Sequence, residues 1–132
     1  MMRIDDVYME AEKRKITVDT FPFKAISAMS LPEGCIAYDP RKFDTEAELK
    51  TALAHEIGHI DSGAFYHSNT PLLTRAICEY KADKRAVQML LPLDQLRRAL
   101  RKGYTEAWQL AELFDVPENF IKRAIQIYDL TA

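Results

Sequence analysis

Two histidines and a glutamate stand close together in the segment His55-Glu56-Ile57-Gly58-His59. On an α-helix, residues four apart lie about 40° apart around the axis, so both imidazoles project from one face and can bind one ion. Neutral imidazole nitrogens suit Zn²⁺, which accepts a tetrahedral site. Glu56 lies about 100° round from His55, where it cannot complete the ligand set but can act as general base on an attacking water. The pattern therefore predicts one Zn²⁺ per chain beside a catalytic carboxylate.

A catalytic zinc site normally takes three protein ligands, so a third must come from elsewhere in the chain. His67 is the only further histidine, but its spacing from His59 does not fit the metzincin pattern. The alternative is Glu79, on a helix expected from Pro71 to Leu91. Asp83 follows one turn later and could accept the free N–H of a ligating histidine. The residues by themselves leave the choice between His67 and Glu79 open.

Tyr66 and His67 follow the expected end of the histidine helix. Either side chain could stabilise the oxyanion that develops on a substrate carbonyl, because both carry a polar hydrogen. Either could equally be an ordinary loop or core residue. The sequence does not choose between these interpretations.

The histidines need a helix, and its boundaries are well marked. Thr45-Glu46-Ala47-Glu48 is a capping box and Gly63 is a C-terminal stop, which predicts a helix from about Glu46 to Ser62. Thr70 and Pro71 suit the start of the next helix, and Pro92 ends it near Leu91. Further helices are expected around 93–101 and 106–114, and a last one beginning at a capping signal from Asp115 to Glu118.

The part of the chain before Pro40 has a different character. A short helix is expected over the first dozen residues. From Ile16 to Asp39, β-forming residues alternate with prolines and a glycine, and we expect two or three short strands, including Cys35–Tyr38, in a small antiparallel sheet. The fold class predicted is α+β: a small N-terminal sheet packed on a mainly helical body that carries the zinc site.

Composition limits the possible functions. The 132 residues, 48% of them hydrophobic and 29% charged, suit one globular domain, and no linker or repeat divides the chain. Eighteen basic against twenty acidic residues give a net charge of −2, unlike the basic balance of a nucleic-acid binder. Two cysteines make no disulfide framework, and no segment has the pattern of a secretory signal or a membrane span. We therefore expect a soluble cytoplasmic protein without a membrane partner.

Three blocks of the chain resemble the ImmA/IrrE family of zinc metallo-endopeptidases, and the resemblance as a whole covers about residues 25 to 128. They are Leu53–His59, Glu79–Pro92 and Leu110–Pro117. The resemblance implies a gluzincin-like site with Glu79 as the third ligand and Asp83 as its support. It also implies a protein substrate, a helix-turn-helix repressor of a mobile element or prophage. Arg85 departs from the family, which usually has phenylalanine there, so the resemblance does not extend to the packing at that position.

Two alternatives come from other classes of protein. The segment from Trp108 to Ile125 also scans as a DNA-binding helix-turn-helix, but residues 93–132 hold six basic and six acidic side chains, and this net charge of zero supplies little of the attraction to phosphates. A zinc-dependent sensor or adaptor without proteolysis is the second alternative, although a purely structural site has no use for Glu56. We expect the helices of residues 93–132 to be a docking surface for the substrate protein, on the premise that the zinc site does not need them.

Overall fold

The structure is a computed structural model, and it describes residues 1–130. Its elements follow in the order α1 (Ile4–Lys13), β1 (Thr17–Thr20), β2 (Ala28–Leu31), β3 (Cys35–Tyr38), a 3₁₀ turn (Pro40–Lys42), α2 (Glu46–Ser62), α3 (Leu72–Leu90), α4 (Leu93–Arg101), α5 (Ala107–Phe114) and α6 (Glu118–Ile127). The predicted α+β class is confirmed. None of the helices in this part of the chain is both long enough and apolar enough to cross a membrane.

The three strands form a mixed sheet in the order β1-β3-β2. β2 and β3 are antiparallel neighbours joined by a tight turn, in which Gly34 adopts a φ of +100° that only glycine takes readily. β1 pairs with β3 in the parallel direction, with Thr17 opposite Cys35. The expectation of an antiparallel sheet is therefore wrong for this pair. β3 inserts between β1 and β2, and residue alternation along a strand carries no information on which strand becomes its neighbour.

α2 has the bounds predicted for the histidine helix. Thr45 caps it, because its hydroxyl accepts the backbone N–H of Glu48 at 3.1 Å. The Glu48 carboxylate accepts the N–H of Asp44, one residue before the partner that a complete capping box would use. Gly63 ends the helix in the left-handed conformation, with φ +66°.

The following helices differ from the prediction at their starts. α3 begins at Leu72, with Pro71 rather than Thr70 as its N-cap, and ends at Leu90, just before Pro92. Asp115 does not open the last helix as the capping signal suggested. It adopts a left-handed φ of +53° and closes α5 instead, a conformation that aspartate tolerates better than most residues. α6 then starts after Pro117.

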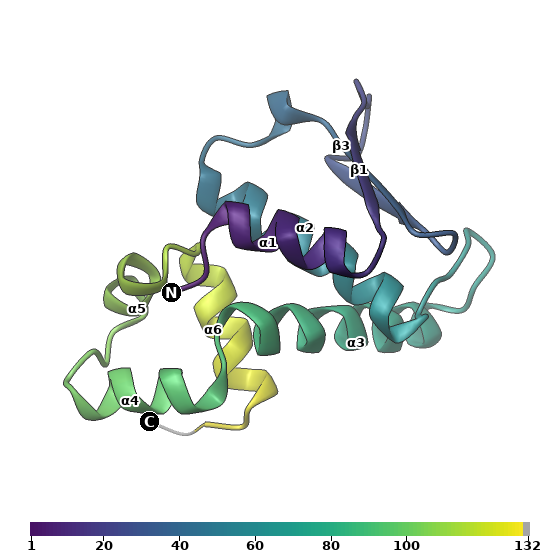
Figure 1. Cartoon of the computed structure of the whole chain (residues 1–132). Helices are drawn as coiled ribbons and strands as arrows, with labels where there is room; N and C mark the ends of the chain where they lie inside the picture. Colours follow the sequence, from purple (N-terminus) through teal and green to yellow (C-terminus); the bar gives the residue numbers. More distant parts are fainter. Residues whose placement is uncertain (131–132) are drawn as a thin grey trace.

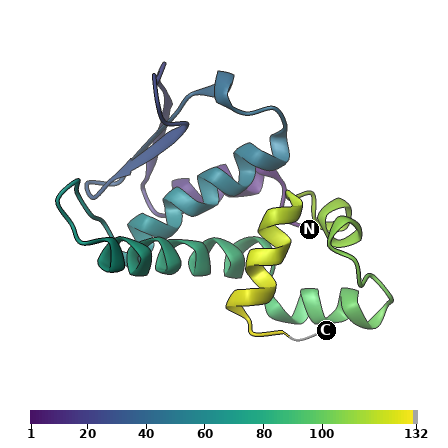
Figure 2. The ribbon, with the colours of Figure 1, turned by 180° about the vertical axis from the view of Figure 1, so that it is seen from behind.

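α2 lies at the centre of the molecule. α1 packs along one side of it, α3 runs below it, and the sheet stands beside its C-terminal half, while α4, α5 and α6 gather at the opposite end (Figures 1 and 2). Leu53 and Ile57 of α2 are buried in the core, and Ile121 of α6 belongs to the same apolar cluster. α2 and α3 approach so closely that a Cβ on Gly58 would lie 2.4 Å from the carbonyl oxygen of Ala82.

Candidate metal centre

His55, His59 and Glu79 come together where α2 crosses α3. The two histidines lie one turn apart on α2, with ring centroids 4.8 Å apart. The Glu79 carboxylate, on α3, has one oxygen 2.9 Å from Nε2 of His55 and the other 3.1 Å from Nε2 of His59. One potential ligand atom from each residue lies within 4.8 Å of the other two. The close contact at Gly58 allows this approach, because α3 could not bring Glu79 to the histidines if the helices stood further apart.

In both His55 and His59, Nδ1, the ring nitrogen that does not face Glu79, lies within hydrogen-bond distance of an acceptor. Nδ1 of His59 lies 2.7 Å from the carbonyl oxygen of Ala64, and Nδ1 of His55 lies 2.8 Å from Oδ1 of Asp83. A carbonyl and a carboxylate only accept, so both Nδ1 atoms carry the hydrogen. In the neutral rings the two Nε2 lone pairs then face the Glu79 carboxylate, and these three acceptors need a cation between them. Two imidazole nitrogens and a carboxylate are the ligand set of a catalytic Zn²⁺ site, so the residues fit this metal.

Charge also favours a cation here. Burial by itself lowers the pKa of His55, but the hydrogen bond with Asp83 and the charges of Glu56, Asp83 and Glu79 outweigh it, so the pKa lies above the ordinary 6.5. For Asp83, burial acts in the opposite direction and raises the pKa. The hydrogen bonds and charges of His55 and Arg123 outweigh burial, so the pKa of Asp83 lies below its ordinary value. Asp83 is therefore ionised at neutral pH and keeps its role as acceptor for His55.

Glu56 faces an open groove beside His55, His59 and Glu79. The groove has a volume of about 430 Å³, and its walls come from the edge strand β2, from α2 and α3, and from the loop between these helices. Oε1 of Glu56 accepts the hydroxyl hydrogen of Ser30, on β2, at 2.7 Å. This hydrogen bond aims the carboxylate into the groove, where a substrate carbonyl could meet it.

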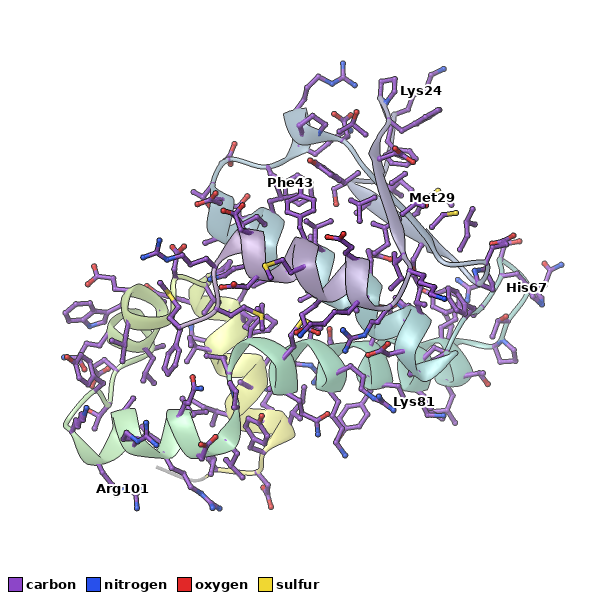
Figure 3. All side chains as sticks on the ribbon, in the orientation of Figure 1. Lys24, Met29, Phe43, His67, Lys81 and Arg101 are labelled. Carbon is purple, nitrogen blue, oxygen red and sulfur yellow. The ribbon has the colours of Figure 1, made fainter. Side chains whose placement is uncertain are left out.

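Of the two loop residues considered for oxyanion stabilisation, only Tyr66 lies at the groove. Tyr66 lines the groove, and its hydroxyl donates to Oε1 of Glu79 at 3.0 Å, a hydrogen bond that raises the pKa of the phenol above its ordinary value. His67 does not line the groove. Its side chain is exposed in the middle of the α2–α3 loop (Figure 3). Its Nδ1 accepts the backbone N–H of Asn69.

Sequence reasoning missed two side chains that touch the site. Ser30 lies on a short strand, far in the sequence from the His55–His59 motif. No pattern in the residues next to it indicates that it would be a partner of Glu56. Arg123, on α6, donates from Nε to Oδ2 of Asp83 at 3.0 Å, although the two residues lie 40 positions apart in the sequence. The helices after Pro92 are therefore not separate from the candidate site, because α6 contacts Asp83.

A helix-borne histidine pair with an intervening glutamate, completed by a carboxylate from the next helix, defines a site of the metallopeptidase type. The chain belongs to the Peptidase_M78 family, whose model is described as the IrrE N-terminal-like domain and matches residues 3–126. No curated protein and no solved structure matches the chain. The family match confirms the resemblance found in the sequence and supports a metallopeptidase-type function.

Proposed function

We propose that this protein is a zinc-dependent endopeptidase that cleaves a specific regulatory protein. The observation that carries the proposal is the convergence of His55, His59 and Glu79 on one point, with Glu56 beside them in the same groove. A structural zinc site is closed by four protein ligands, whereas this set has three and opens onto solvent.

Each residue has a defined task in this proposal. His55, His59 and Glu79 hold one Zn²⁺, which when bound acidifies a water and polarises the substrate carbonyl. Glu56 takes the proton of the attacking water and returns it to the departing amine. Ser30 keeps the Glu56 carboxylate turned into the groove. Tyr66 can exchange its hydrogen bond with Glu79 for one with the substrate oxyanion, which it would stabilise as a neutral donor.

We further propose that the substrate is a helix-turn-helix repressor of a mobile element or prophage. The support is the resemblance to the ImmA/IrrE family. A peptidase of this size also gains selectivity from a docking surface remote from the chemistry. The helices of residues 93–132 remain our candidate, although residues 131–132 lie outside those the structure describes. Arg101 of α4 lies at the end of the molecule opposite His67 of the α2–α3 loop (Figure 3), so the α4 part of this surface lies apart from that loop, while α6 contacts Asp83.

Metal analysis tests the first part of the proposal. Protein purified without a chelator should hold about one zinc per chain, and Glu79→Ala should lose most of it, because only the two histidines remain. His67→Ala is the matched control and should retain zinc, since this residue lies outside the groove. Full zinc retention by Glu79→Ala would remove Glu79 from the ligand set.

Cleavage tests the second part. The wild type and Glu56→Gln are each mixed with the repressor encoded nearest the gene, and the products are followed by mass spectrometry. The wild type should cut at one site, while Glu56→Gln keeps zinc and fold but does not cut. If the repressor stays intact while another protein is cleaved, only the proposed substrate is wrong and the proposed peptidase activity stands. If a zinc-loaded wild type cuts neither the repressor nor any protein of the host lysate, a zinc-dependent sensor or adaptor becomes the better description.

A further inference from the structure

Arg123 connects the C-terminal helices to a metal-ligand histidine. Its Nε donates to Oδ2 of Asp83 at 3.0 Å, and the other oxygen of the same carboxylate holds Nδ1 of His55 at 2.8 Å. The guanidinium lies 5.6 Å from the ring centre of Tyr80, on α3, and its Nη1 donates to Gln126. A continuous series of contacts thus runs from α6 through α3 to α2.

We propose that Arg123 is a positioning residue for the metal site, which holds the Asp83 carboxylate in the orientation that His55 needs. This inference rests on the proposed metal-binding function. Asp83 uses one oxygen for each donor, so rotating its carboxylate breaks both hydrogen bonds at once. Without Arg123, a single hydrogen bond would hold a side chain that is 29% exposed, and Asp83 could turn towards water.

The consequence for the metal follows from the imidazole tautomers. While Asp83 accepts from Nδ1 of His55, the ring hydrogen stays on that nitrogen and the Nε2 lone pair faces Glu79. If Asp83 turns away, Nδ1 loses its acceptor and the hydrogen can occupy Nε2 instead. Before Nε2 could bind Zn²⁺, this hydrogen would have to return to Nδ1 through solvent, where no acceptor would hold it, so the affinity of the site for zinc falls.

A simple charge effect predicts the opposite result. A guanidinium that acted only as a nearby positive charge would repel Zn²⁺, and its removal would strengthen binding. If Arg123 and Asp83 formed only a partly exposed ion pair, removing Arg123 would change the stability of the protein slightly and leave metal binding unchanged. The sign of the change in zinc affinity therefore separates positioning from both other roles.

The test measures zinc affinity of the full chain by competition with a chromogenic chelator. We expect Arg123→Ala to bind zinc about tenfold more weakly, the lower end of the effect of residues that orient ligands. Arg123→Lys, which keeps a charged donor, should recover part of the loss. Lys122→Ala, an exposed neighbour on the same helix, is the control and should bind zinc like the wild type.

A double-mutant cycle shows whether Arg123 acts through Asp83. In the Asp83→Ala background, Arg123→Ala should weaken zinc binding no further. In the metal-free protein at a pH where His55 is neutral, its ¹⁵N shifts should report the hydrogen on Nδ1 in the wild type and a tautomer mixture in Arg123→Ala. Unchanged or tighter zinc binding by Arg123→Ala, additivity in the cycle, or unchanged ¹⁵N shifts would overturn the proposal. A wild type that binds no zinc would overturn the proposed function as well.

Discussion

Gly58, between the two histidines, offers the most direct test of how α2 and α3 form the site. A Cβ at this position would lie 2.4 Å from the carbonyl oxygen of Ala82, whereas ordinary contacts begin at 3.4 Å. The obstacle is backbone, so no side-chain rotation removes it. In Gly58→Ala the helices must separate by about 1 Å, the difference between these two distances.

Two opposing effects determine the stability of Gly58→Ala. Alanine improves helix propensity by about 1 kcal/mol, while forcing a methyl group against a buried backbone costs up to about 3 kcal/mol. The variant should therefore be destabilised by up to about 2 kcal/mol, and its melting temperature should fall by up to roughly 8 °C for a chain of this length.

The effect on the site should exceed the effect on stability. The histidines lie on α2 and Glu79 on α3, so the same separation moves the ligands about 1 Å apart, and a displacement of this size costs about a hundredfold in rate. Thermal unfolding, zinc affinity and cleavage rate measure the three effects. Ala82→Gly in addition should not rescue the variant, because the carbonyl of residue 82 remains. A Gly58→Ala protein of unchanged stability and zinc affinity would refute the close packing.

The remaining predictions concern the general base and two buried charges. Ser30→Ala should lower kcat up to about tenfold with unchanged KM and zinc content, because the lost hydrogen bond orients Glu56 only; a fall in zinc content would contradict this. The hydrogen bonds from Arg41 lower the pKa of Asp39 from 3.8 to about 2, so their stabilisation is complete above pH 3.8 and is lost as the pH falls through 2. Asp39→Asn should therefore lose less stability than the wild type between pH 4 and pH 2 in urea unfolding, and equal losses would refute this assignment. Lys50 is 1% exposed and donates to two backbone carbonyls at 3.0 Å, so Lys50→Met should cost about 2 kcal/mol through the unpaired oxygens, and an unchanged urea midpoint would refute it.

The helices were more predictable than the sheet because their signals are local. Thr45, Gly63 and Pro92 act on the residues beside them, and α2 and α3 end where these signals place the boundaries. Asp115 misled the prediction because aspartate suits both an N-cap and a left-handed C-terminal position, and only the path of the chain after α5 decides between them. Strand pairing depends on distant partners, so the parallel pairing of β1 with β3 had no counterpart in the local pattern.

The sequence by itself determined the geometry of the two histidines and Glu56, which carry the proposed chemistry. The four-residue spacing of His55 and His59 places both rings on one face of the helix, whatever the rest of the fold. The same periodicity places Glu56 beside that face. Only the tertiary structure brought Glu79 to the histidines in place of His67, and only it supplied Ser30 and Arg123. The physical reason is range: a helix relates residues within two turns, whereas the meeting of α2, α3, β2 and α6 depends on the packing of the whole core.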